Sequence, residues 1–559
     1  MLFLLGTLIA LFGLIIYRLT SLMLFPEEAR LGSAKRTRTF FDIIPAKRGN
    51  IYDCHGVALA ITVPILEIGI DPQLLRANEE KMVMEFLGKK LSIPSELLLR
   101  KWEERMKKSP HGRWISMGET ASESIYQNII RAKLPGVYGR RKFQRIYPQA
   151  HGACHVVGFL NGEGVACCGV ERFADFFLRG QDGWIVSEKD GRRQELVQHR
   201  SRNVPPMDGS DVYLNLDMNI QRIVERELEY IRANFHPNFS VIIVTEAESG
   251  KLVAMACFPN YDPNHYGKFP LDHMRNRAVA DIYEPGSVFK IVPSSAALEE
   301  GIVQEHSTFD CSMDSYEYAG EKYSLPRDHS SFEVLTLREV LRQSSNRGSA
   351  QIAIRLGRDR FYSYVRAFGF GEKSGYGFDG DLSGILRPPH LWDGLTITRM
   401  PMGHAIGVTP MQMHMAMGVL ASEGYLFTPL VLDKIIPPRE NLLKNGDILR
   451  KPIIRRQVLS RRTVERIRSI IGSGEIGTKP SLSLAYKTGT AQKIVDGKYV
   501  HNQHIASCSG FFPTQNPKYV ITVVVDSPQC DGGTAWGSRY AQPSFQRIAT
   551  ELFRQLYAN

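Results

Sequence analysis

The pattern of apolar and polar residues changes near residue 214 and divides the chain into two regions. Residues 25–210 contain short apolar runs, many turns and one polar helical stretch at about 77–108, with no dominant period and no repeat. Beyond residue 214, apolar residues recur at helical spacing, and Asp217 before them is a typical N-cap. These apolar residues are Ile220, Val224, Leu228 and Ile231. The pattern predicts a helix that begins just after Asp217.

Strand-like runs occur near both ends of the second region, with a mainly helical stretch between them at roughly 287–475. The early pair is joined by a turn at 248–250, which is typical of a hairpin. Because early and late strands have to pair, we expect residues 211–559 to form one α+β domain. It would hold a five-stranded, mostly antiparallel sheet with helices on both faces and a helical insertion. The predicted strands are 240–247, 251–257, 482–493, 503–512 and 518–526, and a helix at about 543–556 closes the chain.

The first 17 residues carry no charged side chain, and the apolar run extends to about residue 24. This length is sufficient for a membrane span, which takes roughly 17–25 residues. A cleaved signal peptide is the alternative, but a basic start and a small-residue cleavage site just after the run are absent. We therefore expect residues 1–24 to be an uncleaved anchor. The uncharged leader also suggests that the native protein begins upstream with a short basic stretch.

Composition indicates a globular protein of several domains. The chain has 559 residues, 43% of them hydrophobic and 23% charged, with a net charge of +11. Its basic residues are scattered and form no compact block interleaved with aromatics, so a solvated basic surface is expected and no nucleic-acid partner. The 8 cysteines include no CxxC pair. We therefore expect no metal and no cofactor, while a disulfide in an exported domain stays open.

Three short motifs with catalytic residue types occur in order. Ser287 and Lys290 stand three residues apart where a loop enters a helix, so both would lie on one helix face. A helix N-terminus favours negative charge near Ser287, and a partly desolvated lysine loses its proton and activates a serine. Alone, this SxxK motif is a near-chance match. Motifs for metalloproteases, P-loop enzymes and α/β-hydrolases are absent.

The second and third motifs supply further polar groups. Ser344 and Asn346 lie in a polar break between two helical runs, where a serine could relay a proton and an asparagine could bind an amide. Lys487, Thr488, Gly489 and Thr490 lie on a strand, where glycine permits close approach of a backbone or substrate. A similar Lys373–Gly375 triplet lies in a glycine-rich run without strand character, and we reject it.

Taken together, the SxxK, SxN and KTG motifs resemble those of the penicillin-recognising serine transferases and β-lactamases. The chain most closely resembles a class B penicillin-binding protein, with residues 25–210 as its N-terminal pedestal (dimerisation-like) domain and 211–559 as its transpeptidase domain. Arg48, Gly49, Asp53 and Gly56 resemble the first pedestal box. Cys54 departs from that box, which usually has arginine there. Asp381 replaces a usual glutamate.

The resemblance implies acyl transfer from a stem peptide. Ser287 would attack the penultimate D-Ala carbonyl with Lys290 as base, and Ser344 would pass a proton to the leaving amine. Backbone N–H groups of Ser287 and Thr490 would form the oxyanion hole. The substrate would be held by Lys487, Thr488 and Thr490 at its carboxylate and by Asn346 at its amide, with Gly489 between them on the strand.

The resemblance also implies partners, a location and a role. Expected ligands are peptidoglycan stem peptides with their lipid-linked precursor, and β-lactam antibiotics. Expected protein partners are a polytopic glycan polymerase and division proteins. The enzyme would be single-pass in the bacterial cytoplasmic membrane, with its catalytic domain outside. The AQK sequence after Thr490 favours the septal type over the elongation type. The remaining alternatives are a D-Ala-D-Ala carboxypeptidase or β-lactamase, and a non-catalytic scaffold or β-lactam sensor.

Overall fold

The structure is a computed structural model, and it divides the chain into two compact units. One unit comprises residues 1–48 and 179–209, and the other comprises 49–178 and 210–559. The two are described separately below. The residues described are 2–24, 39–75, 79–108, 112, 114–121, 123–132, 134–189, 195–378, 380–438, 447–476, 482–495, 498–529 and 533–557.

The first unit contains an apolar helix and a small sheet. Helix α1 (Leu2–Leu24) is long and apolar enough to cross a membrane by length and composition. Strand β1 (Thr39–Ile44) pairs antiparallel with β6 (Gly183–Lys189). Strand β6 also pairs with the short strands β7 (Glu195–Leu196) and β8 (Arg202–Val204). The apolar run of the sequence therefore forms one continuous helix, as predicted.

The second unit is built on a central antiparallel sheet with strand order β11-β10-β23-β22-β21-β20. The early strand β10 (Phe239–Glu246) pairs along its whole length with the late strand β23 (Tyr519–Asp526), which confirms that early and late segments share one sheet. The count of five strands was wrong, because β20 (Gly472–Ile476) adds a sixth at the edge. Its sequence, GSGEI, has no apolar alternation to mark it as a strand. The remaining strands are β11 (Leu252–Phe258), β21 (Leu482–Val495) and β22 (Lys498–Phe512).

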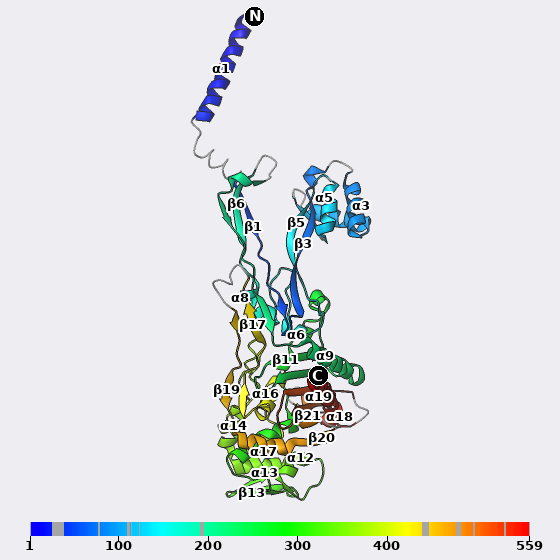
Figure 1. The fold of residues 1–559 in the computed structure, drawn as a ribbon, viewed down its shortest axis with the longest axis vertical. Coiled ribbons are helices and arrows are strands. Elements are labelled where there is room, and N and C mark those ends of the chain that lie inside the picture. The colour runs from blue at the N-terminus through cyan, green and yellow to red at the C-terminus, as the bar shows by residue number, and fades with distance from the viewer. Residues whose placement is uncertain are drawn as a thin grey trace. The chain divides into compact units, whose positions relative to one another are not determined.

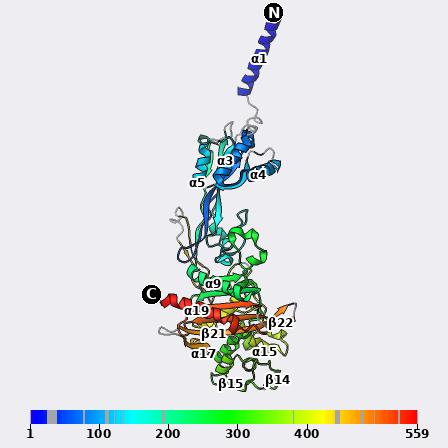
Figure 2. The ribbon, with the colours of Figure 1, turned by 90° about the vertical axis from the view of Figure 1, so that its right-hand side faces the viewer.

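Helices cover both faces of this sheet, as predicted (Figure 2). On one face, α9 (Met218–Phe235) and α19 (Gln542–Tyr557) pack through a core that contains Ile242 and Val523 of the sheet. On the other face, α16 (Pro410–Ala421) packs against a separate core with Ile243 and Val524. Neighbouring residues thus point to opposite cores, as the pleat requires. The predicted N-cap is confirmed, since Asp217 accepts a hydrogen bond from the backbone N–H of Asn219.

The segment between β11 and β20 supplies the helices that carry two of the motifs. Its principal members are α11 (Ile291–Glu299), α12 (Leu337–Gln343), α13 (Asn346–Leu356), α14 (Arg358–Ala367) and α17 (Arg461–Ile471). The expectation of a mainly helical stretch was too simple, because several short strand pairs interrupt it. The longest hairpin pairs β13 (Ser315–Tyr318) with β14 (Glu321–Ser324) across a tight turn at Ala319 and Gly320. Strands of three to five residues are too short for a period to identify them.

A second sheet joins the N-terminal part of this unit to the part that contains the central sheet (Figure 1). Strand β2 (Ile51–Tyr52) pairs with β3 (Ala58–Ile70) and also with β9 (Asp211–Leu214), which in turn pairs with β17 (Leu432–Ile436). The polar helical stretch predicted at 77–108 forms two helices, α3 (Glu79–Leu91) and α4 (Ser95–Lys108). Pro94 lies between them, and proline disfavours helix in the residue before it.

Candidate active site

Ser287 and Lys290 lie in a short 3₁₀ helix, η5 (Gly286–Lys290), that leads into α11. Residues three apart eclipse one another in a 3₁₀ helix, so the two side chains share one side. Gly286 has a φ of +60°, and a Cβ on it would lie 2.8 Å from the carbonyl oxygen of Thr490. A glycine is therefore required immediately before Ser287, both by the backbone conformation and by contact with β21.

The Lys290 amino group is fully buried and surrounded by oxygen atoms of the second motif. Its Nζ lies 2.7 Å from Asn346 Oδ1 and 3.1 Å from Ser344 Oγ, and it also donates to the backbone carbonyl of Ser344. The predicted grouping of Lys290 with Ser344 and Asn346 is therefore present. These contacts hold Lys290 against the loop that follows α12.

The loop that carries Ser344 is held in an unusual conformation. Ser344 ends α12 with a φ of 61°, a left-handed conformation that costs about 1–3 kcal/mol for a residue other than glycine. The Asp328 carboxylate maintains the next residues, because it accepts hydrogen bonds from the hydroxyl of Ser345 and from the backbone N–H groups of Asn346 and Arg347. Asn346 also donates through Nδ2 to the carbonyl of Arg327 at 2.8 Å.

Strand β21 brings the third motif to the same place. The Nζ of Lys487 lies 3.1 Å from Ser344 Oγ and 3.0 Å from the carbonyl of Thr488. Gly489 faces η5, and a Cβ on it would lie 2.7 Å from the carbonyl oxygen of Pro285. The glycine of this motif thus permits the approach of another backbone, which is one of the two roles that the sequence suggested. The hydroxyl of Thr490 accepts a hydrogen bond from the backbone N–H of Gly537.

The two lysines differ in how their pKa values are shifted. Burial is the main cause that lowers the pKa of Lys290 well below its ordinary value, the nearby charge of Lys487 adds to this, and Asp328 opposes it. Burial also lowers the pKa of Lys487, to about 8. The stronger depression of the pKa of Lys290 makes it the one of the two lysines that releases its proton more readily, while Lys487 keeps its charge more readily. One lysine is thus suited to accept a proton and the other to bind an anion.

The contacts around Ser344 would suit a neutral Lys290. Its two hydrogens would go to the carbonyl of Ser344 and to Oδ1 of Asn346, and its lone pair would then face the Ser344 hydroxyl. Lys487 donates to the same hydroxyl oxygen. Ser344 therefore connects the two lysines. The Ser287 hydroxyl is half-buried and makes no hydrogen bond to any residue that the structure describes, which leaves it open for a substrate.

Two cavities lie along β21. The smaller, of about 360 Å³, is lined by Lys487 and Thr488 together with Arg342 of α12. The larger, of about 1190 Å³, is lined by Gln492 farther along the strand, by Glu284 before the Ser287 turn and by Tyr499 of β22. Volumes of a few hundred Å³ or more are typical of ligand sites. The larger cavity lies beyond the three motifs, and no motif indicated it.

The four residues of the predicted pedestal motif lie away from the group around Lys290. Asp53 and Gly56 belong to the turn after β2, where Gly56 has a φ of +84°. Gly49 donates its N–H to the carbonyl of Leu178 at 2.8 Å. Arg48 is a buried residue at the end of the first unit. None of the four contributes to the group around Lys290 in the described part of the chain.

Sequence reasoning missed Asp328 because it belongs to none of the three motifs. The rejection of Lys373–Gly375 as a motif fits the structure, since buried Asp381 holds this segment as a loop. Its carboxylate accepts hydrogen bonds from the backbone and hydroxyl of Ser374 and from the backbone of Gly375. Among the cysteines that the structure describes, all seven are free thiols: Cys54, Cys154, Cys167, Cys168, Cys257, Cys311 and Cys508. Cys530 lies outside the described residues.

Two family descriptions match the chain. Residues 240–550 match the penicillin-binding protein transpeptidase domain, and residues 43–214 match the penicillin-binding protein dimerisation domain. The first match contains all three motifs, and the second contains the segment with Gly49, Asp53 and Gly56. Together they cover most of the chain outside the N-terminal helix.

Curated relatives and solved structures agree with these matches. The chain is 31% identical to Stage V sporulation protein D of Bacillus subtilis over 91% of its length and 78% of the relative's. It is 28% identical to Peptidoglycan D,D-transpeptidase FtsI of Escherichia coli, over 92% and 84% of the two lengths. Penicillin Binding Protein 2X of Streptococcus thermophilus shares the fold with a TM-score of 0.74 at 20% identity, over 93% of this chain and 81% of that one.

Proposed function

The chain belongs to the penicillin-binding proteins that carry transpeptidase and dimerisation domains, and from this premise we propose that it is a septal peptidoglycan D,D-transpeptidase. The observation that carries the proposal is the convergence of Lys290, Ser344, Asn346 and Lys487, with Ser287 in the same short helix as Lys290. The sequence motifs had already indicated the same family. The residue roles below are part of the proposal.

In the first half-reaction, Ser287 Oγ attacks the penultimate D-Ala carbonyl of a donor stem peptide, and neutral Lys290 takes the hydroxyl proton. The backbone N–H groups of Ser287 and Thr490 stabilise the oxyanion, an interaction whose loss typically costs about 3–4 kcal/mol. The peptide C–N bond then breaks. Ser344 gives its proton to the departing D-Ala amine and regains one from Lys290, so that the acyl-enzyme forms with both lysines ready for the second step.

In the second half-reaction, an amine of a neighbouring stem peptide attacks the ester. The amine loses a proton through Ser344 to Lys290, the C–O bond to Ser287 breaks, and the serine recovers its proton from Lys290. The charged Lys487 binds the carboxylate of the donor with Thr488 and Thr490, while Asn346 bonds its amide. The 1190 Å³ cavity beside Glu284 and Tyr499 is large enough for part of a second peptide.

The relatives' names support the substrate and inhibitors that we propose. The Escherichia coli relative is named a peptidoglycan D,D-transpeptidase, and related solved structures from Mycobacterium contain aztreonam or ampicillin. We therefore assign stem peptides with their lipid-linked precursor as substrate and β-lactams as inhibitors. Helix α1 would anchor the enzyme in the bacterial cytoplasmic membrane with the catalytic domain outside, beside a polytopic glycan polymerase and division proteins.

A second candidate role is cell-wall synthesis during sporulation. The 31% identity to Stage V sporulation protein D favours it, and the chemistry at Ser287 would be unchanged. Depletion separates the two roles. Filaments without septa would support division, while normal growth with defective spores would support the second candidate.

Labelling with a fluorescent penicillin tests the chemistry. The full-length protein should form a stable adduct with the intact mass of one acyl group, and Ser287→Ala should form none while keeping its thermal unfolding transition. Lys290→Ala should reduce the acylation rate constant about 100-fold or more, as expected for loss of a general base. An adduct that persists on Ser287→Ala would contradict the assignment of the nucleophile.

A further inference from the structure

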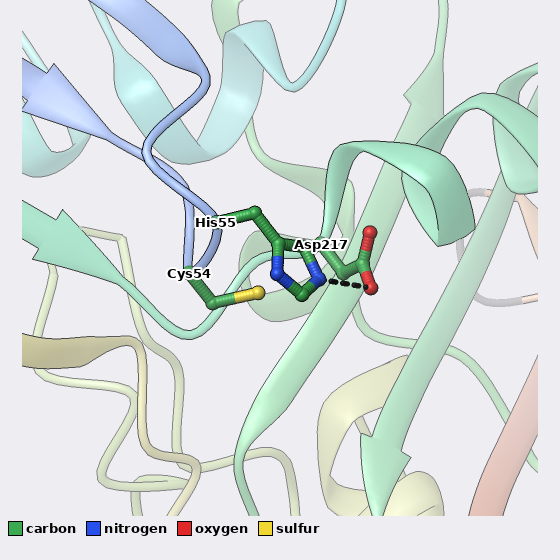
Figure 3. Close-up of side chains that lie close together, drawn as sticks. All are labelled: Cys54, His55 and Asp217. Atoms are coloured by element: carbon green, nitrogen blue, oxygen red, sulfur yellow. Dashed lines mark hydrogen bonds and ion pairs between the residues drawn. The ribbon is translucent and has the colours of Figure 1, made fainter.

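A group of three potential metal ligands lies in the second unit, away from the proposed active site. Cys54 and His55 form the turn after β2, and Asp217 caps helix α9. Figure 3 shows the imidazole of His55 between the thiol of Cys54 and the carboxylate of Asp217. One potential ligand atom from each side chain lies within 4.8 Å of the other two. We propose that these three side chains bind a Zn²⁺ ion, with water as the fourth ligand.

The spacing suits a tetrahedral ion. Bonds of about 2.0–2.3 Å from zinc to nitrogen, oxygen and sulfur place neighbouring ligand atoms roughly 3.3–3.5 Å apart. The Nε2 of His55 and Oδ2 of Asp217 already lie 3.1 Å apart. The Cys54 thiol has to close the remaining distance. Both Cys54 and His55 are exposed, so rotation of their side chains is free to bring the three atoms together.

The backbone fixes the three residues relative to one another. Buried Asp53 accepts hydrogen bonds from the backbone N–H groups of His55, Val57 and Met218, so one carboxylate ties the turn to the start of α9. The N–H of Cys54 donates to the carbonyl of Leu216 at 2.9 Å. An ion bound here would therefore reinforce a preformed arrangement, which lowers the entropic cost of binding.

The carboxylate of Asp217 is also oriented before any ion binds. Its Oδ1 accepts the N–H of Asn219 as the helix cap, and its Oδ2 is the oxygen that faces His55. A hydrogen-bonded ligand of this kind is typical of zinc sites, where a second partner fixes the orientation of the ligand.

The local charge favours a cation. The carboxylate of Asp217 faces His55, and that of Asp53 accepts a hydrogen bond from the backbone N–H of His55, so the turn carries a negative field. A divalent cation reverses that field and stabilises the thiolate instead. Binding would form the S–Zn bond and break the S–H bond, with the proton released to solvent. The donor set of thiolate, imidazole and carboxylate matches the ligands that Zn²⁺ takes in proteins.

The sequence analysis expected no metal, because metal motifs are recognised by short spacings between ligands. Cys54 and His55 are adjacent, and the third ligand lies more than 160 residues later. The competing explanation is an exposed His55–Asp217 ion pair with a nearby thiol, which would contribute little by itself. The two explanations differ in whether Cys54 contributes to binding.

Cobalt substitution of the metal-free, full-length protein distinguishes them. We expect uptake of one Co²⁺ per chain with a thiolate-to-cobalt charge-transfer absorption, and displacement by one Zn²⁺. Cys54→Ser should remove this absorption. His55→Ala and Asp217→Asn should each lower the affinity at least about tenfold, and the Asn variant retains a capping side chain.

Cys167→Ser is the matched control, because Cys167 is another free, partly exposed cysteine of the same unit. It should bind Co²⁺ as the unaltered protein does. All four variants should still label with penicillin, which reports a folded catalytic domain independently of the metal. The absence of stoichiometric Co²⁺ uptake, or an absorption that survives Cys54→Ser, would overturn the proposal.

Discussion

Two carboxylates in the second unit do the same structural task in different surroundings. Asp328 accepts hydrogen bonds from Ser345, Asn346 and Arg347 at the start of α13. Asp53 accepts them from His55, Val57 and Met218, the last at the start of α9. In each case a side chain from outside the helix satisfies N–H groups that the helix itself leaves unpaired. Each carboxylate therefore fixes a loop against a helix N-terminus.

The two loops differ in what their side chains face. The Asp328 loop presents Ser344 and Asn346 to two buried lysines, whereas the Asp53 turn presents Cys54 and His55 to solvent. A buried cation is costly unless polar groups are placed accurately around it, so the first loop has little freedom. The second turn has exposed side chains that are free to rotate. The same kind of hydrogen-bonded carboxylate thus positions a reaction centre in one place and a surface site in the other.

The largest effect should come from removing the carboxylate of Asp328, which holds the catalytic loop. Asp328→Ala removes three hydrogen bonds and the negative charge that opposes the pKa depression of Lys290. A hydrogen bond to a charged group contributes about 1.5–3 kcal/mol. If only the equivalent of one such bond is lost from the transition state, about 3 kcal/mol, the rate falls roughly 100-fold. We expect the second-order rate constant of penicillin acylation to fall about 100-fold. Stopped-flow labelling measures it, and an unchanged rate would remove Asp328 from the positioning of Asn346.

Removing the carboxylate of Asp53 should lower the stability of the protein and leave acylation intact. Asp53→Ala leaves the backbone N–H groups of His55, Val57 and Met218 without their acceptor. We expect the free energy of unfolding to fall by about 2 kcal/mol, measured by urea denaturation, with acylation within about twofold of the unaltered protein. A large loss of acylation in a folded Asp53→Ala protein would break the contrast between the two regions.

The pH dependence should report the buried lysines, which among the described residues are Lys290 and Lys487 of the catalytic region. Lys487 is charged below its pKa of about 8 and loses its charge above it, so carboxylate binding weakens as pH rises. We expect acylation to fall about tenfold per pH unit above that pKa. Lys487→Arg keeps the charge and should abolish this decline. If acylation still declined with rising pH in the arginine variant, the decline would have to come from the titration of another group.

The smallest effect should come from Gly56 in the turn after β2. Its φ is +84°, and a Cβ there would meet no atom within 4 Å. Gly56→Ala should therefore lower the free energy of unfolding only by the cost of a left-handed conformation, about 1 kcal/mol. Thermal unfolding should detect a small decrease, with penicillin labelling unchanged. A larger decrease would mean that the turn itself, and not only Asp53, stabilises the unit.

Much of the fold could be predicted because its elements carry a local signal. Helix α9 has a cap and a regular apolar face, and β10 and β23 are continuous apolar strands. Strand β20 has no such signal and was missed. The short hairpin of β13 and β14 was likewise hidden in a stretch expected to be helical. These elements form because a neighbouring strand offers hydrogen-bond partners, and a period within the segment is not required.

The sequence by itself determined the residue types of the reaction, the order of the three motifs and the elements that bear them. Tertiary structure alone decided that Asp328 fixes the Ser344 loop, that Gly489 admits the backbone before Ser287, and that Asp217 meets Cys54 and His55. The physical reason is the range of the interactions. Periodicity and capping act within a few residues and leave a pattern along the chain. Contacts between distant segments depend on how the chain packs, and they leave no such pattern.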